Sequence, residues 1–305
     1  MGTELLLVAG ISPQGVVQQL VFGVATGGIY ASLALALILI YRAMEAINFA
    51  QGEMATFTTF LAWTLITQVH LSYWIVFPIT VAVAIAGGIA IERVIIRPVE
   101  RAPILTVVLV TLGLFSVFNG LSGLIWGYTI RTFPTPFPVT PVFIAGVGIG
   151  VQDLGLIGVS LALLLLIYLF FSRTRLGLMM RSSALYPQSS RLLGVRVGWM
   201  LALGWGLSAG VGAVSGMLIA PVTVLDPGLM QAVLLYAFTA AVLGGIESPV
   251  GAVVGGVVVG VLLALVGTYV PGAQDLRIVL GFVVIVAVLL FRPGGLVGRA
   301  HVSRV

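Results

Sequence analysis

The sequence predicts an all-α, polytopic transmembrane helix bundle, and three observations support this fold class. Hydrophobic residues make up 60% of the 305 residues and charged residues only 8%, with a mean hydropathy of +1.22. Long apolar runs recur along the chain, and arginines gather in the short segments between them. Because soluble domains carry roughly 25% charged residues, lipid must be the solvent for most of these side chains.

Helices of about 17 to 25 apolar residues are long enough to cross a hydrocarbon core of roughly 30 Å. We count nine such runs, and the pattern supports eight to ten spans. They lie at residues 16–40, 52–67, 73–91, 103–126, 154–171, 199–220, 230–246, 250–270 and 277–291. The segment around Gly244 to Pro249 is also compatible with a re-entrant hairpin in place of two full spans. We expect residues 1–305 to form a single transmembrane domain.

The arginines predict the orientation, because cytoplasmic loops of membrane proteins carry an excess of basic residues. All 14 basic residues are arginines, and nine spans place three clusters of them on the same side as Arg42. The clusters are Arg93, Arg97 and Arg101; Arg173, Arg175, Arg181, Arg191 and Arg196; and Arg292, Arg299 and Arg304. The loops with His70, Arg131, Asp226 and Asp275 then lie outside. The N-terminus is predicted to be periplasmic and the C-terminus cytoplasmic.

Several classes of function lack the residues that they need. The arginines are interleaved with apolar runs and form no aromatic–basic stripe, so we expect no nucleic-acid partner. The chain has no cysteine, and His70 and His301 are isolated, so we predict no metal site and no enzyme activity. A chain without lysine has no G-x-x-x-x-G-K-[ST] loop, so we predict no bound cofactor and no ATP site. A secondary transporter would need ionisable residues for ion coupling and a channel a filter-like repeat, and neither pattern is seen.

Two loops are longer than simple connections. The outer loop, residues 127–153, contains four prolines and is expected to lie across the periplasmic face as a structured cap, or to be a plain linker. The inner loop, residues 172–198, contains five arginines and predicts a short amphipathic helix from Pro187 to Leu193 that ends at Gly194. Such a helix either anchors the loop to anionic lipid or transmits movement from a cytoplasmic motor.

Polar residues are rare in the predicted spans, and charged ones cost at least about 2.5 kcal/mol at a helix centre. Glu53 begins the second span, with Asn48 and Gln51 just before it. Glu53 is compatible with capping helix amides, with pairing to Arg42, or with a role in a translocation pathway. Two further residues, Asn119 and Gln231, either line the same pathway or bond between helices.

Five ordered segments of the sequence resemble branched-chain amino acid permeases of the LivH type. The first, Gly27 to Gly52, contains Ile47-Asn48-Phe49-Ala50, followed by Gln51 where this family usually has His. Four others share the family's pattern: Glu92-Arg93 with Arg97-Pro98 and Arg101-Ala102-Pro103; Thr111 to Leu114; Arg181 to Val195; and Gly244-Gly245 through Ser248 to Gly255-Gly256. The inner loop departs from the family at Leu185 to Gln188, where an acidic pair is usual, and Glu247 stands where Gly is common.

The resemblance implies a permease subunit of an ATP-driven importer in the bacterial inner membrane. It implies a second related permease, two cytoplasmic ATPase subunits that bind the ATP, and a periplasmic substrate-binding protein. The substrates it implies are branched-chain or related small amino acids, with urea or short amides as the alternative. ATPase coupling would then involve Arg181, Pro187, Arg191, Leu192, Leu193 and Gly194, and the pathway Asn48, Gln51, Glu53, Asn119 and Gln231.

Overall fold

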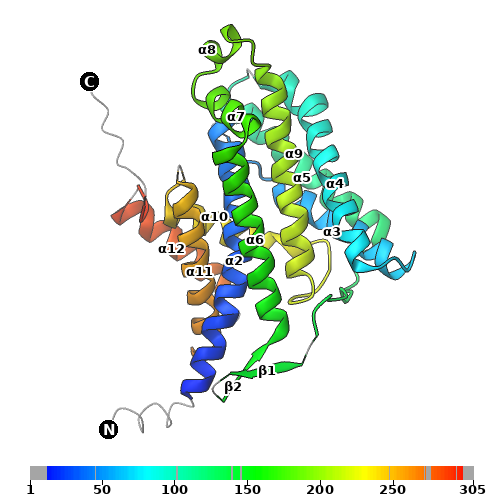
Figure 1. Cartoon of the computed structure of the whole chain (residues 1–305), viewed down its shortest axis with the longest axis vertical. Helices are drawn as coiled ribbons and strands as arrows, with labels where there is room; N and C mark the ends of the chain where they lie inside the picture. The colour runs from blue at the N-terminus through cyan, green and yellow to red at the C-terminus, as the bar shows by residue number, and fades with distance from the viewer. Residues whose placement is uncertain are drawn as a thin grey trace. The chain divides into compact units, whose positions relative to one another are not determined.

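The computed structural model describes residues 12–44, 46–100, 102–138, 140–144, 146–246, 248–270, 272, 276–292 and 294–297. This part of the chain is almost entirely helical (Figure 1). The helices are α2 (Pro13–Met44), α3 (Gln51–Thr67), α4 (Tyr73–Ile91), α5 (Ile104–Trp126), α6 (Val151–Arg173), α7 (Arg175–Leu185), α8 (Pro187–Leu192), α9 (Val197–Ile219), α10 (Leu229–Gly244), α11 (Pro249–Tyr269) and α12 (Arg277–Phe291). A π-helical turn, η1 (Glu92–Ile96), and a 3-10 turn, η2 (Arg97–Val99), follow α4.

Each of the nine predicted apolar runs coincides with a helix, so their positions are confirmed. Within the described residues, six helical stretches have the length and apolar character to cross a membrane. They are Pro13–Arg42, Tyr73–Val99, Ile104–Trp126, Val151–Arg173, Val197–Ile219 and Pro249–Tyr269. The remaining three helices, α3, α10 and α12, have 17, 16 and 15 residues. Nine crossings, and the sides on which the termini lie, therefore stay predictions.

The lipid-exposed character of the chain is clearest on α5 and α6. Large apolar side chains on these helices point away from the protein core, among them Leu105, Leu124 and Leu166. Apolar surface on this scale does not occur on soluble monomers and marks contact with lipid or with another protein. Together with the six long apolar helices, it identifies a multi-pass membrane protein.

The chain forms two compact units, each built from segments that are distant in sequence. Unit 1 contains residues 1–31, 137–161 and 235–305, and unit 2 contains residues 32–136 and 162–234. The helices α2, α6 and α10 are each divided between the two units. That residues 1–305 act as a single domain stays a prediction.

In unit 1 the first part of α2 packs closely against α11. A Cβ atom added to Gly27 would lie 2.8 Å from the carbonyl oxygen of Gly256, and one added to Gly23 would lie 2.6 Å from the Cα of Val261. Glycine at these positions lets the two backbones approach, which is how helices associate where lipid supplies no hydrophobic driving force. The small residues of α11 are therefore a packing surface for α2.

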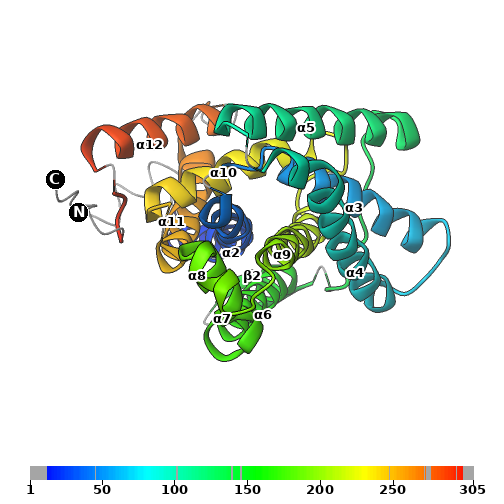
Figure 2. The same ribbon diagram turned by 90° about the horizontal axis from the view of Figure 1, so that it is seen from above.

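In unit 2 the helix α9 is the centre of the packing. It lies against α4 and α3 (Figure 2), and its Trp205 is almost completely buried in a core that includes Ile40, Met54 and Leu114. The contact between α4 and α9 depends on Gly88, because an added Cβ there would lie 2.6 Å from the carbonyl oxygen of Trp205.

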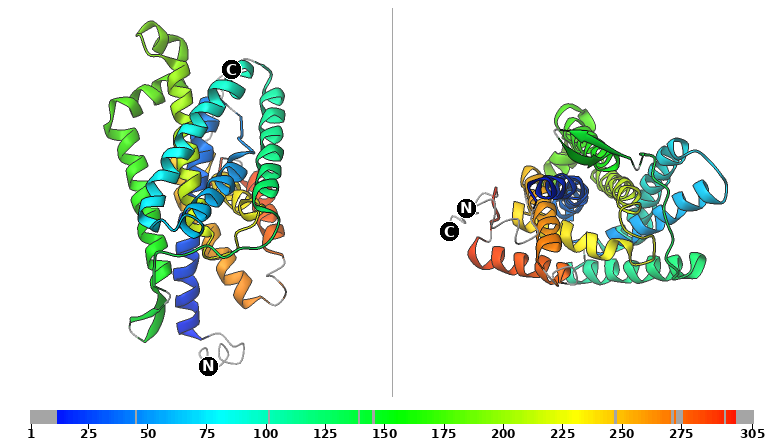
Figure 3. Two further views of the ribbon diagram at one scale, coloured as in Figure 1. Left: turned by 90° about the vertical axis from the view of Figure 1, so that its right-hand side faces the viewer. Right: turned by 90° about the horizontal axis from the view of Figure 1, so that it is seen from below.

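The predicted outer loop is shorter than expected, because α6 begins at Val151 instead of after Asp153. It also contains a feature that the sequence analysis missed, an antiparallel hairpin of β1 (Pro141–Ile144) and β2 (Val147–Gly150), which leads into α6 (Figure 3). Gly146, with φ +81°, lies in its turn, where the left-handed backbone suits glycine. The hairpin belongs to unit 1.

The first part of the outer loop folds over one end of unit 2, as a cap would. The backbone of Arg131 exchanges two hydrogen bonds with Leu225, with N···O distances of 2.9 and 3.0 Å. Its guanidinium donates to the carbonyl oxygen of Trp126 at 2.7 Å and lies 4.4 Å from the ring centre of Trp63. That this end faces the periplasm stays a prediction.

Arg97, from the first arginine cluster, packs on a residue of the predicted inner loop within unit 2. That residue is Gly198, the last one of the predicted inner loop, which lies at the start of α9. Other residues used for the orientation lie outside the described residues. They are Arg101, Asp275, Arg299 and Arg304, and the same holds for Glu247 and His301.

Candidate functional site

Glu53 lies in the first turn of α3, directly after a break in the helical backbone. The break follows α2, and there the Oδ1 atom of Asn48 accepts a hydrogen bond from the backbone N–H of Ala50 at 3.0 Å. Asn competes in this way with the regular helical bonds and so favours a turn. Since α3 restarts at Gln51, the carboxylate of Glu53 sits where the helix dipole favours a negative charge.

Glu53 is completely buried and connects three helices of unit 2. Asn119 of α5 donates its Nδ2–H to one carboxylate oxygen at 3.2 Å, and Gln231 of α10 donates its Nε2–H to the other at 3.4 Å. The Nδ2 atom of Asn119 also donates to the carbonyl oxygen of Pro227 at 2.9 Å. The structure therefore brings together three of the five predicted pathway residues, and the partners of Glu53 are amides instead of Arg42.

The three side chains of this cluster differ in their access to solvent. Glu53 is buried, Asn119 is half-buried and Gln231 is exposed. They form a polar track from the surface of unit 2 to a carboxylate in its interior. Carboxylate and amide oxygens accept hydrogen bonds, so the track can bind an ammonium group or a neutral amide that donates N–H groups. In the described residues no group of three or more His, Cys, Asp or Glu side chains could hold a metal ion.

The other two predicted pathway residues belong to a separate, fully buried network. Gln51 donates its Nε2–H to the carbonyl oxygen of Ser208 at 2.8 Å, and its Oε1 atom accepts from the hydroxyl of Ser208 at 3.0 Å and from Asn48 at 3.3 Å. The Ser208 hydroxyl also lies 3.1 Å from the carbonyl oxygen of Ala36. This network fastens α3 to α9. Sequence reasoning missed Ser208, because neither of the two serines in a helix rich in Gly and Ala gives a distinctive signal.

The six predicted coupling residues lie on α7, on α8 and just after α8, and all six are exposed. As predicted, Pro187 begins a short helix, and Gly194, with φ +82°, follows its end. The backbone N–H of Gly194 bonds to the carbonyl oxygen of Arg191 at 3.0 Å, which closes the helix. Leu192 and Leu193 expose 90% and 84% of their surface.

The loop around α8 is ordered by local interactions. Upstream, the hydroxyl of Thr174 caps α7 by accepting a hydrogen bond from the N–H of Gly177 at 3.0 Å. Ser190 is the buried residue of α8, and its carbonyl oxygen accepts from the N–H of Val195 at 2.9 Å. Two exposed leucines are thus presented at the end of a fixed helical turn.

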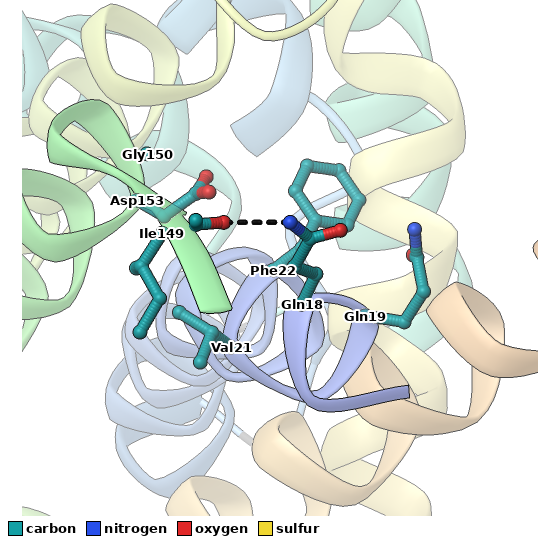
Figure 4. Close-up of a pocket in the computed structure, with 8 residues that line it drawn as sticks. Gln18, Gln19, Val21, Phe22, Ile149, Gly150 and Asp153 are labelled. Carbon is teal, nitrogen blue, oxygen red and sulfur yellow. Dashed lines mark hydrogen bonds between the residues drawn. The ribbon is translucent and has the colours of Figure 1, made fainter. Parts of the chain in front are cut away.

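A second polar feature lies in unit 1, between α2 and the hairpin. The Nε2–H of Gln18 donates to the carbonyl oxygen of Gly148 at 2.8 Å, and both residues line a cavity of about 210 Å³ together with Asp153 (Figure 4). None of the predicted site residues lines this cavity. The hydrogen bond between Gln18 and Gly148 holds β2 against the start of α2.

The sequence of this chain is similar to those of known transport proteins. The family model for the permease component of branched-chain amino acid transport systems matches residues 19–289. The high-affinity branched-chain amino acid transport permease BraD of Pseudomonas aeruginosa is 33% identical over 301 residues, which cover 94% of this chain and 97% of BraD. The corresponding LivH protein of Salmonella typhimurium is 29% identical over 303 residues, with the same coverage of 94% and 97%.

Among solved structures, PsaBC from Streptococcus pneumoniae in complex with Fab is similar in fold, with a TM-score of 0.51. The sequence identity is 14%, and the match covers 96% of this chain and 97% of that one. At this identity the likeness concerns the fold alone. The match of the family model over most of the chain, together with BraD, shows that this chain belongs to the family of branched-chain amino acid transport permease components.

Proposed function

We propose that the chain is a permease subunit of an ATP-driven importer in the bacterial inner membrane. In this proposal it forms half of a translocation pathway for branched-chain or related small amino acids and works by alternating access. Its partners are a second homologous permease, two cytoplasmic ATPase subunits and a periplasmic substrate-binding protein. The observation that carries the proposal is α8, a fixed helical turn that presents Leu192 and Leu193 to a partner.

The exposed leucines fit a protein partner better than water. Burying one such side chain is worth about 1.5 to 3 kcal/mol, so two of them form a strong contact within a small area. Arg191 adds a charge at the same helix end. A groove on an ATPase subunit that bound α8 would move this helix as a rigid element. The reason is that two backbone hydrogen bonds, from Gly194 to Arg191 and from Val195 to Ser190, fix the end of the helix.

The energy for transport must come from that partner, since a chain without lysine contains no nucleotide-binding loop of the P-loop kind. Closure of the ATPase pair on nucleotide would then displace α8 and, through it, α9. Because α9 packs on α3 and α4, such a displacement reaches the helix that carries Glu53.

Within the membrane, we place part of the pathway along the polar track that Glu53, Asn119 and Gln231 form. Its carboxylate suits the ammonium group of an amino acid, which is held there while Asn119 and Gln231 guide it from the surface. The network of Asn48, Gln51 and Ser208 supports this track by holding α3 in place. The large apolar face of α5 is available for lipid and for the second permease.

The test is reconstitution of the complete transporter with Leu192 and Leu193 both replaced by serine. We expect ATPase co-purification and ATPase activity stimulated by the loaded binding protein to fall by at least about tenfold, since one lost buried leucine already costs that much. Leu178→Ser is the matched control, because Leu178 is an exposed leucine of α7 outside the proposed contact. Full coupling in the double variant would refute the proposed role of α8.

A further inference from the structure

Glu92, at the end of α4, is a buried acid that the proposed pathway does not use. It is completely buried, and neither carboxylate oxygen has a hydrogen-bond partner among the described residues. A buried group without partners is costly, and natural proteins keep few of them. The environment of Glu92 should therefore show where a partner can come from.

The backbone around Glu92 leaves the α-helical pattern. The residues Glu92–Ile96 form a π-helical turn, in which the N–H of Arg97 bonds to the carbonyl oxygen of Glu92. The next residue, Pro98, has no N–H and its ring would clash with the carbonyl four residues earlier, which explains why a regular helix cannot continue. Single π-turns inside or at the end of α-helices are rare and occur often at functional sites.

Two arginines, Arg93 of the π-turn and Arg97 directly after it, pack against the first turn of α9. The guanidinium of Arg93 lies 3.9 Å from the ring centre of Trp199. The Nη2 atom of Arg97 lies 3.1 Å from the place where a Cβ on Gly198 would be, so the guanidinium packs closely on the backbone of this glycine. Both arginines are near enough for their charges to act on the Glu92 carboxylate.

The first turn of α9 is also the point that a displaced α8 would move first. Only residues 193–196 separate α8 from α9, and the N–H of Trp199 bonds to the carbonyl oxygen of Arg196 at 2.9 Å. If this turn shifts, the guanidinium of Arg97 loses its close packing on Gly198 and can move toward a new acceptor. The carboxylate of Glu92 is an acceptor without a hydrogen-bond partner, and the charge of Arg97 acts on it.

We infer that Glu92 is a positioning residue that accepts Arg97 when the first turn of α9 moves. Glu92, Arg97 and Gly198 then form the joint that passes the movement of α8 to α4. In the resting arrangement the carboxylate lacks a partner, and in the displaced arrangement it gains an ion pair, so the joint favours the displaced state. This inference rests on the proposed role of α8 in coupling.

The test compares Glu92→Gln, Arg97→Gln and the double variant in the complete reconstituted transporter. Each single variant is expected to lower ATPase activity stimulated by the binding protein by at least about tenfold, because a hydrogen bond to a charged group shifts an equilibrium by that much or more. The double variant should be no worse than either single one, since both remove the same interaction. Glu100→Gln removes a negative charge that also acts on Glu92 but leaves Glu92 and Arg97 in place, so it is the matched control for a change of charge and should retain coupling.

A second readout separates this role from a purely structural one. Glu92→Gln is expected to raise the unfolding midpoint of the nucleotide-free transporter and to lower that of the vanadate-trapped one, because the charge is costly in the first state and paired in the second. A shift of the same sign in both states, or additive losses in the double variant, would overturn the inference and leave the role of α8 intact. A wild-type transporter whose ATPase does not respond to the binding protein would overturn both.

Discussion

Replacing Glu53 by glutamine removes a carboxylate from the interior of unit 2 while the shape of the side chain stays nearly the same. In the structure, one carboxylate oxygen accepts from Asn119 at 3.2 Å and the other from Gln231 at 3.4 Å. Asn119 is fixed, because the same nitrogen donates to the carbonyl oxygen of Pro227 at 2.9 Å. The new amide nitrogen must therefore face Gln231.

The cost of this change to stability is small. Gln231 is exposed and can rotate its amide to present an oxygen, so one long hydrogen bond is exchanged for another. Hydrogen bonds between membrane helices are worth about 0.6 kcal/mol on average, which limits the loss to below about 1 kcal/mol. Glu53→Ala, in contrast, removes both bonds and leaves a cavity, at about 2 to 3 kcal/mol.

The effect on transport should be much larger than the effect on stability. If the carboxylate binds the ammonium group of the cargo, its loss removes a charge-assisted hydrogen bond and lowers uptake by about 10- to 100-fold. Uptake of labelled leucine into proteoliposomes that contain the complete transporter measures this, and the thermal unfolding midpoint monitors the fold. Glu53→Gln with unchanged uptake and an unchanged midpoint would refute the proposed pathway.

The remaining predictions concern helix packing in unit 2, with thermal unfolding in detergent as the measurement. Gln51→Ala should lower stability by about 2 kcal/mol, because it removes both bonds to the buried Ser208; a shift within error would mean that the network does not hold α3 on α9. Gly88→Ala should destabilise by about 1 to 3 kcal/mol, since its Cβ would meet the carbonyl of Trp205. Gly87→Ala, with nothing within 4 Å of the added atom, should be neutral or stabilising, and equal effects at the two glycines would contradict this.

The sequence predicted the membrane class and the position of every long helix, because each span must supply its own apolar surface and its own backbone hydrogen bonds. The short helix α8 was predictable for a similar reason. Its start at Pro187 and its end at Gly194 depend on backbone preferences of single residues. The hairpin was missed, because four-residue strands give too short a pattern.

The sequence indicated which polar residues belong to the candidate site, but it could not indicate which of them contact one another. Glu53 and Gln51 are two positions apart, yet one turns toward Gln231, 178 residues away, and the other toward Ser208, 157 residues away. Which polar side chains meet is decided by how α3 is rotated between its neighbours. No local pattern encodes that rotation.

Composition and the spacing of apolar runs, arginines, proline and glycine thus determined by themselves that this chain is a helical membrane protein with an exposed helix between two long ones. Only the tertiary structure decided that Glu53 heads a polar track, that Gln51 fastens two helices, and that Glu92 is buried beside Arg97 without a partner. The reason is physical. Solvation by lipid acts on each segment separately, whereas hydrogen bonding in the interior depends on which distant segments the packing brings together.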